Sequence, residues 1–396
     1  MVNKWEPAWE GEEEVSIDEL NEALKGTEGE NVELRTRIRI LVGAENNVKK
    51  ATKIVAKYVE FRKKWNVDDM KPFPLPMPFI GYDVEQYKNE SNTRPPNTPL
   101  EKRMQGVQRF AKAAIYKWDK EGRPVYYERT GHHNVKKLVR DCGEADCIIS
   151  HLHGMEARKL AFEEASKRNG GKLYEKWTVV LDLAGLSFSS HMNVGGISLL
   201  KHLAQLDQDF YPQTMARLLV INTPKIFTGF WKIVKPFIDP LTLKKIKILG
   251  HDYHDTLFEF IEKENIPKEY GGTSEEELPA PPAKKGSDQY EEDGYELVKI
   301  ANGTSHEVKK EGLKAGSIVS WQFKPKSYDV GFEVFVEKNG EKKSVVPYAK
   351  VGTGVFESGS CELEEAADVL LVFDNTYASW RSKQVLFSID VFQPEE

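Results

Sequence analysis

Two apolar segments, joined by one amphipathic segment, constrain the fold of this chain more than any other feature. Residues 177–183 (WTVVLDL) are almost entirely apolar, as in a strand that is buried on both faces, and residues 217–223 (RLLVINT) predict a second apolar strand. Between them, large apolar residues recur at helical spacing: Leu199, Leu203, Leu206 and Phe210. A strand, a helix and a second strand in this order predict a βαβ unit, and therefore an α/β domain with a largely parallel sheet.

Further elements are expected before this unit. Residues 123–129 (RPVYYER) predict a strand, and residues 148–167 predict one helix that ends at Asn169-Gly170-Gly171. An amphipathic helix is expected over 47–65. Its apolar stripe consists of Ala51, Ile54, Tyr58, Phe61 and Trp65. The prolines of 71–79 (KPFPLPMPF) end that helix and impose an extended connection.

The composition changes after Gly271-Gly272. Residues 274–289 are rich in proline and charge and nearly free of large apolar side chains, so they are expected to be a linker. Beyond them, apolar segments without a helical period alternate with turns rich in Gly, Asn and Lys: 319–325, 331–338, 368–375 and 385–392. This pattern predicts a C-terminal β-sandwich of roughly one hundred residues.

Charge is segregated along the chain. The formal net charge of −6 combines −9 in residues 1–34, +10 in residues 35–289 and −7 in residues 290–396. The basic central part permits contact with an anionic surface, although mutual neutralisation of the segments explains the pattern equally well. The three cysteines form neither a disulfide framework nor a metal quartet, and no segment resembles a secretory leader or a membrane span. A cytoplasmic location is therefore expected.

The sequence lacks the motifs of the common enzyme classes. G-x-S-x-G, G-x-x-x-x-G-K-[ST] and H-E-x-x-H are all absent. The best metal candidate is residues 250–255 (GHDYHD), but an ordinary helix N-terminus is the favoured interpretation. Asp182, at the end of a predicted strand, is expected to cap that strand because no partner base is evident. No catalytic and no metal-binding residue is predicted.

The segment 225–249 combines aromatic and basic residues. Its large apolar side chains recur at helical steps: Phe227, Phe230, Trp231, Val234, Phe237 and Ile238. The same segment holds six lysines and one acidic residue, which suits the boundary between lipid tails and anionic headgroups. A core helix with solvated lysines is the alternative, and this segment taken alone favours it.

Six motifs follow one another along the central part of the chain. They are 122–127 (GRPVYY), 179–190 (VVLDLAGLSFSS), 210–212 (FYP), 220–224 (VINTP), 234–240 (VKPFIDP) and 267–272 (PKEYGG). In order and spacing they resemble the CRAL-TRIO lipid-binding and lipid-transfer family. The helix expected at 47–65 is similar to the small N-terminal domain of that family. The C-terminal motifs 321–323 (WQF), 329–332 (DVGF) and 373–377 (FDNTY) are similar to those of a GOLD domain.

The resemblance implies a multidomain protein. It would contain a small N-terminal α-helical domain, an α/β CRAL-TRIO lipid-binding domain and a C-terminal all-β GOLD sandwich. The expected boundaries are 1–34 for an acidic N-terminal segment, 35–75 for the helical domain, 95–273 for the lipid-binding domain, 274–289 for the linker and 290–394 for the GOLD domain.

The resemblance also implies a carrier without catalytic activity, which docks transiently on membranes. One lipid would lie in an apolar cavity under a movable gate helix, here within 225–238. The residues expected to line the cavity or gate are Tyr126, Val180, Phe188, Phe210, Ile221, Phe227, Phe230, Trp231 and Val234. Lys232, Lys235 and Lys245 are expected to contact anionic membrane. Apart from one bound hydrophobic ligand, no cofactor is expected.

Departures from the family pattern bear on the ligand. Members that transfer phosphatidylinositol carry a basic pair and a glutamate where this chain aligns Ala44-Glu45 and Gln213, and only Lys245 matches. Members that bind phosphatidylcholine have hydroxyl residues where this chain has Trp177 and Val179. A buried headgroup without a partner is costly. A weakly polar ligand such as a tocopherol or an isoprenoid is therefore favoured over an inositol phospholipid.

Two other functions stay open. The protein is alternatively a lipid-regulated adaptor in membrane traffic or signalling, in which the GOLD sandwich binds a protein partner. The acidic sandwich and the proline-rich linker motivate that hypothesis. An enzyme that uses the cluster His251–Asp255 is the third hypothesis and predicts a bound metal. Nucleic acid is not expected as a partner.

Overall fold

The computed structural model describes most of the chain, and the described residues form two compact units. The described residues are 4–5, 15–70, 77–82, 99–108, 110, 112–171, 174–187, 191, 194–279, 295–355 and 357–393. The first unit comprises Met1–Ala184, Val194–Thr223 and Pro236–Pro282. The second comprises Gly185–Asn193, Pro224–Lys235 and Ala283–Glu396.

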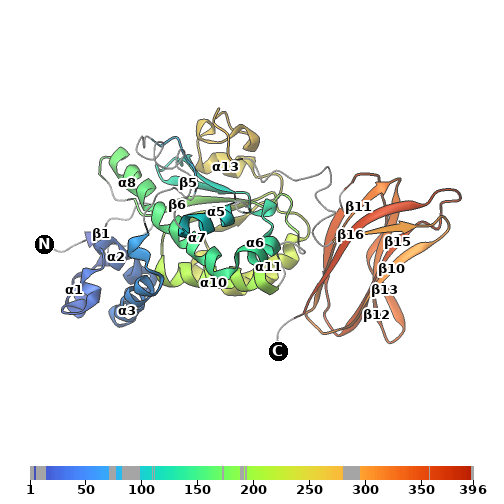
Figure 1. The fold of residues 1–396 in the computed structure, drawn as a ribbon, viewed down its shortest axis with the longest axis horizontal. Coiled ribbons are helices and arrows are strands. Elements are labelled where there is room, and N and C mark those ends of the chain that lie inside the picture. Colours follow the sequence, from blue (N-terminus) through green and yellow to red (C-terminus); the bar gives the residue numbers. More distant parts are fainter. Residues whose placement is uncertain are drawn as a thin grey trace. The chain divides into compact units, whose positions relative to one another are not determined.

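The first unit begins with a small helical layer (Figure 1). Its helices are α1 (Asp18–Leu24), α2 (Leu34–Gly43) and α3 (Val48–Trp65), and a two-stranded ribbon of β1 (Lys4–Trp5) and β2 (Val15–Ser16) precedes them. α3 confirms the helix expected over 47–65, and the side chain of Asn47 caps it by accepting from the backbone N of Lys50 at 2.9 Å.

The three helices share one apolar core. It is built from Ile17, Leu20, Leu24, Ile38, Ile40, Leu41, Ala44, Ala51, Val55 and Tyr58, all buried. Because Ile17, Leu20 and Leu24 belong to the segment 1–34, the helical region starts at α1 rather than at residue 35.

A six-stranded sheet forms the centre of the first unit. Its strands are β3 (Phe79–Ile80), β4 (Ala113–Trp118), β5 (Pro124–Glu128), β6 (Trp177–Asp182), β7 (Met215–Ile221) and β8 (Ile246–Ile248), in the spatial order β3-β4-β5-β6-β7-β8. β4 and β5 are antiparallel, and every other neighbouring pair is parallel. The predicted largely parallel sheet and the strands at 123–129, 177–183 and 217–223 are thus confirmed.

Helices lie between the strands of this sheet and after the last of them. They are α5 (Pro99–Gln108), α6 (Val135–Cys142), α7 (Glu144–Ala157), α8 (Lys159–Arg168), α10 (Val194–Phe210), α11 (Phe227–Val234), α12 (Pro240–Leu243) and α13 (His254–Phe260). Short 3-10 helices lie at Glu28–Asn31, Val67–Asp69, Thr130–His132, Lys235–Phe237, Lys263–Asn265 and Lys268–Tyr270. The single helix expected over 148–167 is wrong, because the chain divides at Arg158 into α7 and α8.

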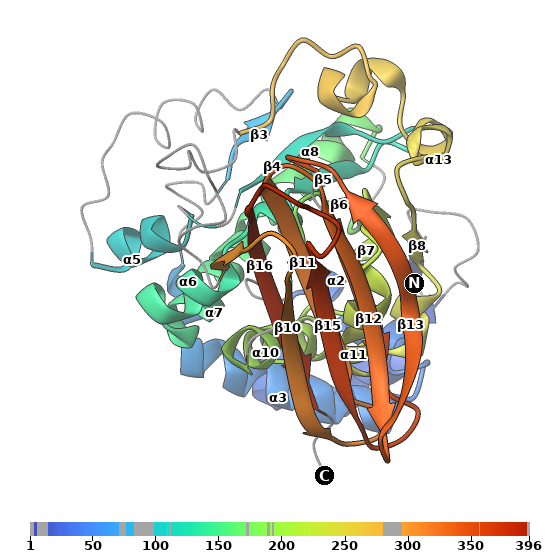
Figure 2. The same ribbon diagram turned by 90° about the vertical axis from the view of Figure 1, so that its right-hand side faces the viewer.

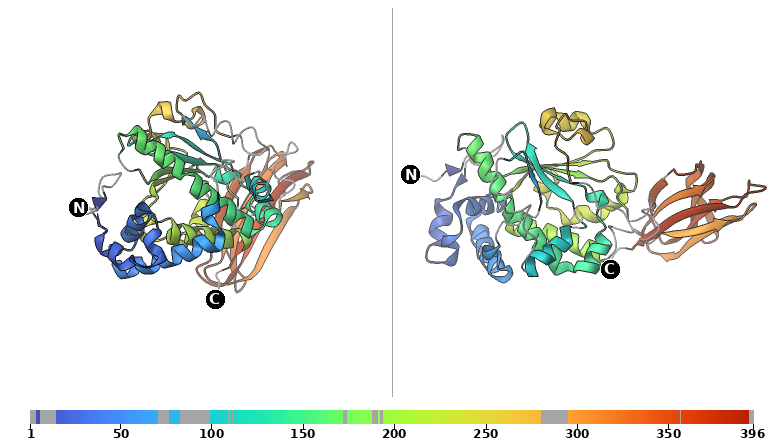
Figure 3. Two further views of the ribbon diagram at one scale, coloured as in Figure 1. Left: turned by 60° about the vertical axis from the view of Figure 1, so that its left-hand side comes forward. Right: turned by 45° about the horizontal axis from the view of Figure 1, so that its top comes forward.

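The two faces of the sheet have different neighbours (Figures 1 and 3). On one face, Tyr127 of β5, Val180 of β6 and Leu219 of β7 pack with Leu257 of α13 and with Ile261, which follows α13, and all five are nearly inaccessible. We call this the closed face. On the other face, Trp177 and Val179 of β6 pack with Phe162 of α8, and α7 and α10 also lie on this side.

The start of the expected linker is part of the first unit. The hydroxyl of Tyr116 in β4 donates to Ser274 Oγ and to the backbone O of Glu276, both at 2.6 Å. Leu278 lies in the core of the closed face with an exposed fraction of 6%. The chain from Ser274 to Leu278 is therefore folded, and the part of the predicted linker from 280 to 289 lies outside the described residues.

The second unit contains an all-β sandwich. One sheet has the order β10-β15-β12-β13 and the other β14-β11-β16-β9, and all pairs are antiparallel (Figure 2). The strands are β9 (Glu296–Ile300), β10 (Ser305–Leu313), β11 (Ile318–Ser327), β12 (Val330–Lys338), β13 (Glu341–Val351), β14 (Glu357–Glu362), β15 (Ala367–Asp374) and β16 (Lys383–Phe392).

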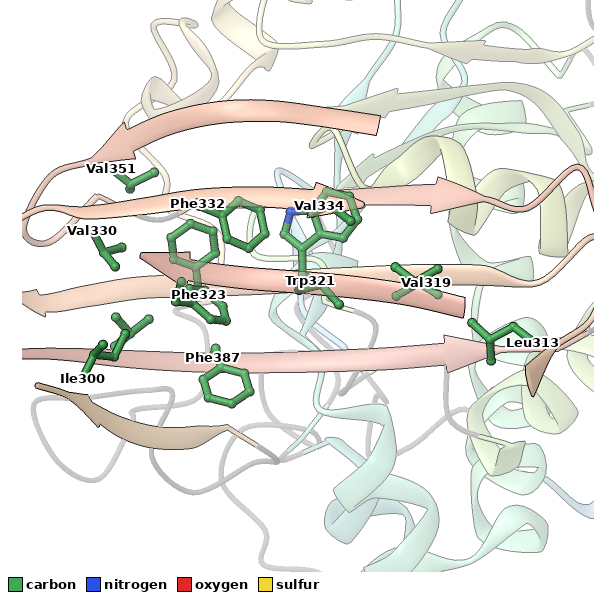
Figure 4. Packing of buried hydrophobic residues seen from close by; sticks show 14 of the residues in the cluster. Ile300, Leu313, Val319, Trp321, Phe323, Val330, Phe332, Val334, Val351 and Phe387 are labelled. Carbon is green, nitrogen blue, oxygen red and sulfur yellow. The ribbon is translucent and has the colours of Figure 1, made fainter. Parts of the chain in front are cut away.

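Aromatic side chains fill the space between these two sheets (Figure 4). Phe332 packs with Phe323 and Phe373, with ring centroids 4.4 and 5.1 Å apart, and Trp321 and Phe387 extend the cluster. The alternating strand pattern after residue 290 therefore builds the sandwich that the sequence predicts.

A partly buried ion pair joins the helical layer to the α/β domain. Glu156 of α7 accepts from Arg62 of α3 at 3.1 Å and from the hydroxyl of Tyr211 at 2.9 Å. Burial opposes ionisation of Glu156, but Lys159 and Arg62 outweigh it, so its pKa lies below the ordinary value. The carboxylate thus stabilises the fold in its charged form.

We expect Glu156→Gln to lower the free energy of unfolding by about 2 kcal/mol, because Arg62 loses its buried partner and keeps only the exposed carboxylate of Asp68. The contribution of Glu156 is complete above the ordinary carboxyl pKa of about 4.3 and is lost as the pH falls through its lowered folded value. Urea unfolding of both proteins between pH 3 and pH 7 measures this. Glu22→Gln, in the exposed pair with Lys25, is the control and should cost less than about 0.5 kcal/mol. Equal losses from the two substitutions would contradict the prediction.

Candidate functional site

The face of the sheet opposite the closed face is incompletely covered. Four of its residues in the central strands stay half-buried: Tyr126, Leu181, Met215 and Leu218. On the closed face of the same strands, Val180, Leu219 and Ile221 have exposed fractions of 1%, 0% and 0%. We call the half-buried side the accessible face. Since these strands lie in the middle of the sheet, the difference does not come from an exposed sheet edge.

Aromatic rings occupy one end of the accessible face. Tyr126 of β5 and Trp177 of β6 lie with ring centroids 4.7 Å apart. The guanidinium of Arg158 lies over Trp177, 4.0 Å from the ring centroid, which is cation–π geometry. The hydroxyl of Tyr126 donates to Glu128 at 2.6 Å. Burial and then the charge of Glu128 raise the pKa of Tyr126 well above its ordinary value. This tyrosine is therefore neutral and serves as an apolar ring with a satisfied hydroxyl.

Two of the predicted lining residues lie on the wrong face. Val180 and Ile221 belong to the closed face, where they pack with Leu257 and Ile261 near α13. Successive side chains of a strand point to opposite faces, so Val179 and Leu181, the neighbours of Val180, share the accessible face with Tyr126. Val180 and Ile221 therefore do not contribute to a site on the accessible face.

Phe210 has a different role from the predicted one. Its ring stacks on Phe61 of α3, with centroids 3.9 Å apart and planes inclined by 6°. It thereby joins α10 to the N-terminal helices. Phe188 lies outside the described residues.

The predicted gate segment forms α11, in the second unit. Phe227 and Val234 are buried, whereas Phe230 and Trp231 are half-buried and stack on Phe227 with centroid distances of 6.0 and 5.8 Å. The aromatic helix is thus confirmed, and Phe230 and Trp231 keep accessible surface.

Lysines of the same segment contact the sandwich strand β14 of the same unit. Lys225 pairs with Glu357 at 3.2 Å, and Lys232 pairs with Glu362. Lys235, at the start of a 3-10 helix, is exposed. Two cations next to the aromatic stripe therefore already have acidic partners within the chain.

Lys245 is not a surface lysine. It is half-buried, and its Nζ donates to Gln213 Oε1 at 3.0 Å and to the backbone O of Met215 at 3.1 Å. Burial lowers its pKa. The neighbouring Lys176 is fully buried, and burial, with Lys245 adding repulsion, lowers the pKa of Lys176 to about 6. Lys245 therefore reinforces the base of β7 and is poorly placed to contact a membrane surface.

The strand-end role predicted for Asp182 is confirmed. Its carboxylate accepts from the backbone N of Ala184 at 3.0 Å, from Asn222 Nδ2 at 2.9 Å and from the hydroxyl of Tyr270 at 2.9 Å. In the 250–255 segment, His251 Nδ1 lies 3.3 Å from Asn222 Oδ1, and His254 stacks on Tyr253. Within the described part of the chain, no three His, Cys, Asp or Glu residues are grouped so that they could hold a metal ion.

Strand alternation in the sequence indicates which residues share the accessible face. Strand alternation starting from Tyr126 and its parallel partner Val179 would have selected Leu181 and Leu218 and rejected Val180. Arg158 could not be found in this way, because its position depends on the division between α7 and α8.

The geometry thus defines an α/β domain whose sheet is closed on one face and accessible on the other. Residues 109–272 match the family model of the CRAL/TRIO domain. A CRAL-TRIO domain-containing protein of Saccharomyces cerevisiae is 38% identical over 156 residues, which are 39% of this chain and 50% of that protein. The chain therefore spans about half the length of this yeast relative.

Solved structures show weaker likenesses. The crystal structure of Sfh5 is 17% identical, with a TM-score of 0.44, over 65% of this chain and 77% of that chain. The Yersinia pseudotuberculosis-derived mitogen is 9% identical, with a TM-score of 0.21, over 26% of this chain and 87% of that chain. Neither likeness is close enough to bear on function. Among the described residues, none of the helices is long and apolar enough to cross a bilayer.

Truncations on the two faces are expected to have different costs. Ile221→Ala, on the closed face, should lower the free energy of unfolding by about 3 kcal/mol, because it leaves a cavity in a packed core. Leu181→Ala, on the accessible face, should cost less than about 1.5 kcal/mol, because part of this side chain is already accessible. Urea unfolding of both variants measures the difference. Equal costs would show that both faces are packed alike.

Proposed function

We propose that this protein binds one hydrophobic ligand, such as a lipid, against the accessible face of its CRAL/TRIO domain and transfers it between membranes. The observation that carries the proposal is the contrast between the two faces of the same central strands. Leu181, Met215 and Leu218 keep accessible surface in the middle of the sheet, whereas Val180 and Leu219 have almost none. An apolar ligand would complete the packing of the accessible face.

Apolar burial alone would make the binding of such a ligand favourable. Covering about 300 Å² of apolar surface would gain about 7 kcal/mol before the entropic cost of association. The hydroxyl of Tyr126 is already satisfied by Glu128, so the face presents an aromatic ring rather than an unpaired donor. The protein would accordingly be a carrier and not an enzyme.

The aromatic helix α11 would act as the gate of this site and as the contact with the membrane. Phe230 and Trp231 are half-buried, and Lys232 and Lys235 flank them with exposed side chains. Apolar and electrostatic contributions add at a bilayer surface. Because Lys245 is held by Gln213 and Met215, Lys225 replaces it in the proposed contact.

The proposed organisation is that of a peripheral protein of the cytoplasm. The sandwich would be a GOLD domain, and the combination with a CRAL/TRIO domain is similar to that of supernatant protein factor, also called tocopherol-associated protein. Tocopherols, isoprenoids and phospholipids are the candidate ligands, and docking on membranes would be transient.

We expect the purified full-length chain to retain a lipid. Native mass spectrometry should show one adduct per chain, and lipid extraction followed by mass spectrometry should identify it. The same protein should accelerate transfer of that lipid between donor and acceptor vesicles. Repeated recovery of an empty chain that transfers no lipid would refute the carrier function.

Releasing the lysines of α11 should strengthen membrane contact. We expect the double substitution Glu357→Gln with Glu362→Gln to tighten binding to vesicles containing phosphatidylserine by about two- to tenfold, because two exposed ion pairs no longer compete with the anionic lipid. Vesicle co-sedimentation at low and high salt measures this. Glu365→Gln, in the exposed pair with Lys338 elsewhere on the sandwich, is the control. The same gain from Glu365→Gln would mean that only net charge matters.

One feature of the sandwich supports the alternative role as a lipid-regulated adaptor. Trp380 is 91% exposed, in the loop between β15 and β16. Tyr328, Tyr348 and Tyr377 also keep more than a third of their surface exposed. Exposed aromatic residues are typical of the centres of protein interfaces.

The adaptor hypothesis predicts a partner that depends on Trp380. Full-length chain and the Trp380→Ala variant should differ in a quantitative pull-down, with at least about tenfold less of a specific protein on the variant. Vesicle transfer activity should be equal for the two chains. A partner set that is unchanged by the substitution would argue against the adaptor function.

A further inference from the structure

Arg158 is a buried cation at the accessible face, and among the described residues no acidic side chain pairs with it. Arg158 separates α7 from α8, and only 2% of the residue is accessible. Its guanidinium carbon lies 4.0 Å from the ring centroid of Trp177 and 5.8 Å from that of Tyr211. Two aromatic rings therefore hold this cation at the end of the face that also contains Tyr126.

Hydrogen bonding of Arg158 is incomplete. Its Nε donates to the backbone O of Met155 at 3.5 Å, which is a long contact. Across the described ranges, the two terminal nitrogens donate to no residue and no carboxylate lies within 4.0 Å of them. These nitrogens are not among the fully enclosed polar atoms, so the little surface that Arg158 keeps includes its donor groups.

Nearby acids have other partners. Asp207 is the acid with the largest effect on Arg158, but its Oδ1 lies 2.8 Å from His151 Nε2. Glu156 is paired with Arg62. The chain therefore supplies no direct counter-ion for Arg158 among the residues that the structure describes.

The cation nevertheless stays charged at neutral pH. Burial lowers the pKa of Arg158 to about 10, and Asp207 partly opposes that effect. A buried charge without a counter-ion is costly, and the contact with Trp177 recovers only part of the cost. The remaining donors of a guanidinium match the two oxygens of a carboxylate or a phosphate.

We propose that Arg158 anchors an oxyanion headgroup of the bound ligand, a carboxylate or a phosphate. The headgroup would accept hydrogen bonds from the terminal nitrogens of Arg158 next to Trp177. The apolar tail would extend along Tyr126, Leu181 and Leu218. This inference rests on the proposed function, and it favours acidic amphiphiles over the weakly polar tocopherols and isoprenoids.

The test compares acidic probes with neutral probes of the same tail on delipidated full-length protein. One pair is oleate and oleyl alcohol, and the other is dioleoyl phosphatidate and dioleoylglycerol. We expect the acidic member of at least one pair to bind at least about tenfold more tightly to the wild-type chain. Preference in the first pair assigns a carboxylate ligand, and preference in the second assigns a phosphate.

Arg158→Met removes the charge and keeps a flexible apolar side chain. This variant should lose the preference for the acid, while its affinity for the neutral probe stays within about threefold of the wild type. Arg168→Met is the matched control, since Arg168 is exposed in α8 and lies 4.6 Å from the ring centroid of Trp118. It removes a cation–π contact away from Arg158 and should leave the preference unchanged.

A second variant keeps the test valid if Arg158→Met fails to fold. Arg158→Lys keeps a positive charge but loses the planar fork, and it should retain part of the preference. Equal affinity of the wild-type chain for the acidic and neutral members of both pairs would overturn this inference, with the carrier function intact. Failure of every probe to bind would instead overturn the proposed function.

Discussion

The parallel pairing of β6 with β5 and β7 determines the properties of the whole α/β domain. Tyr126 pairs with Val179, and Val179 pairs with Leu218, so these three side chains share one face across three strands. A shift of one residue in β6 would exchange its two faces. The distinction between a closed and an accessible face therefore depends on a fixed register.

Buried polar contacts fix that register. Asp119, after β4, accepts from the hydroxyl of Thr178 at 2.7 Å and from Arg217 at 3.1 Å, and it also accepts from the backbone N of Arg123 at 2.8 Å. Burial raises the pKa of Asp119, although Arg123 and Arg217 oppose this. A slipped β6 would remove the Thr178 hydroxyl from the buried carboxylate of Asp119, and a buried acceptor that loses a donor is costly.

Sequence reasoning predicted the elements of the fold better than the details of the site. A helical stripe identified α3, continuous apolar segments identified β6 and β7, and apolar segments separated by turns identified the sandwich. The sequence pattern did not show that α7 and α8 are separate, because residues on both sides of Arg158 favour helix. The prediction of Val180 rather than Val179 as a lining residue was wrong, because successive residues of β6 point to opposite faces of the sheet. The folded state of Ser274–Leu278 depends on contacts with Tyr116, which is distant in the sequence. Composition alone cannot indicate such long-range contacts.

The hydrogen bonds of Asp182 link several of the sequence motifs of this domain. Three of the six motifs, 179–190, 220–224 and 267–272, contribute Asp182, Asn222 and Tyr270, and these side chains meet at one carboxylate. The three motifs therefore contribute to a single hydrogen-bonded junction. The ring of Tyr270, which completes this junction, packs on the closed face. A chain that shares this signature shares the scaffold behind the sheet. The chemical selectivity of the opposite face has to be determined from its own residues in each protein.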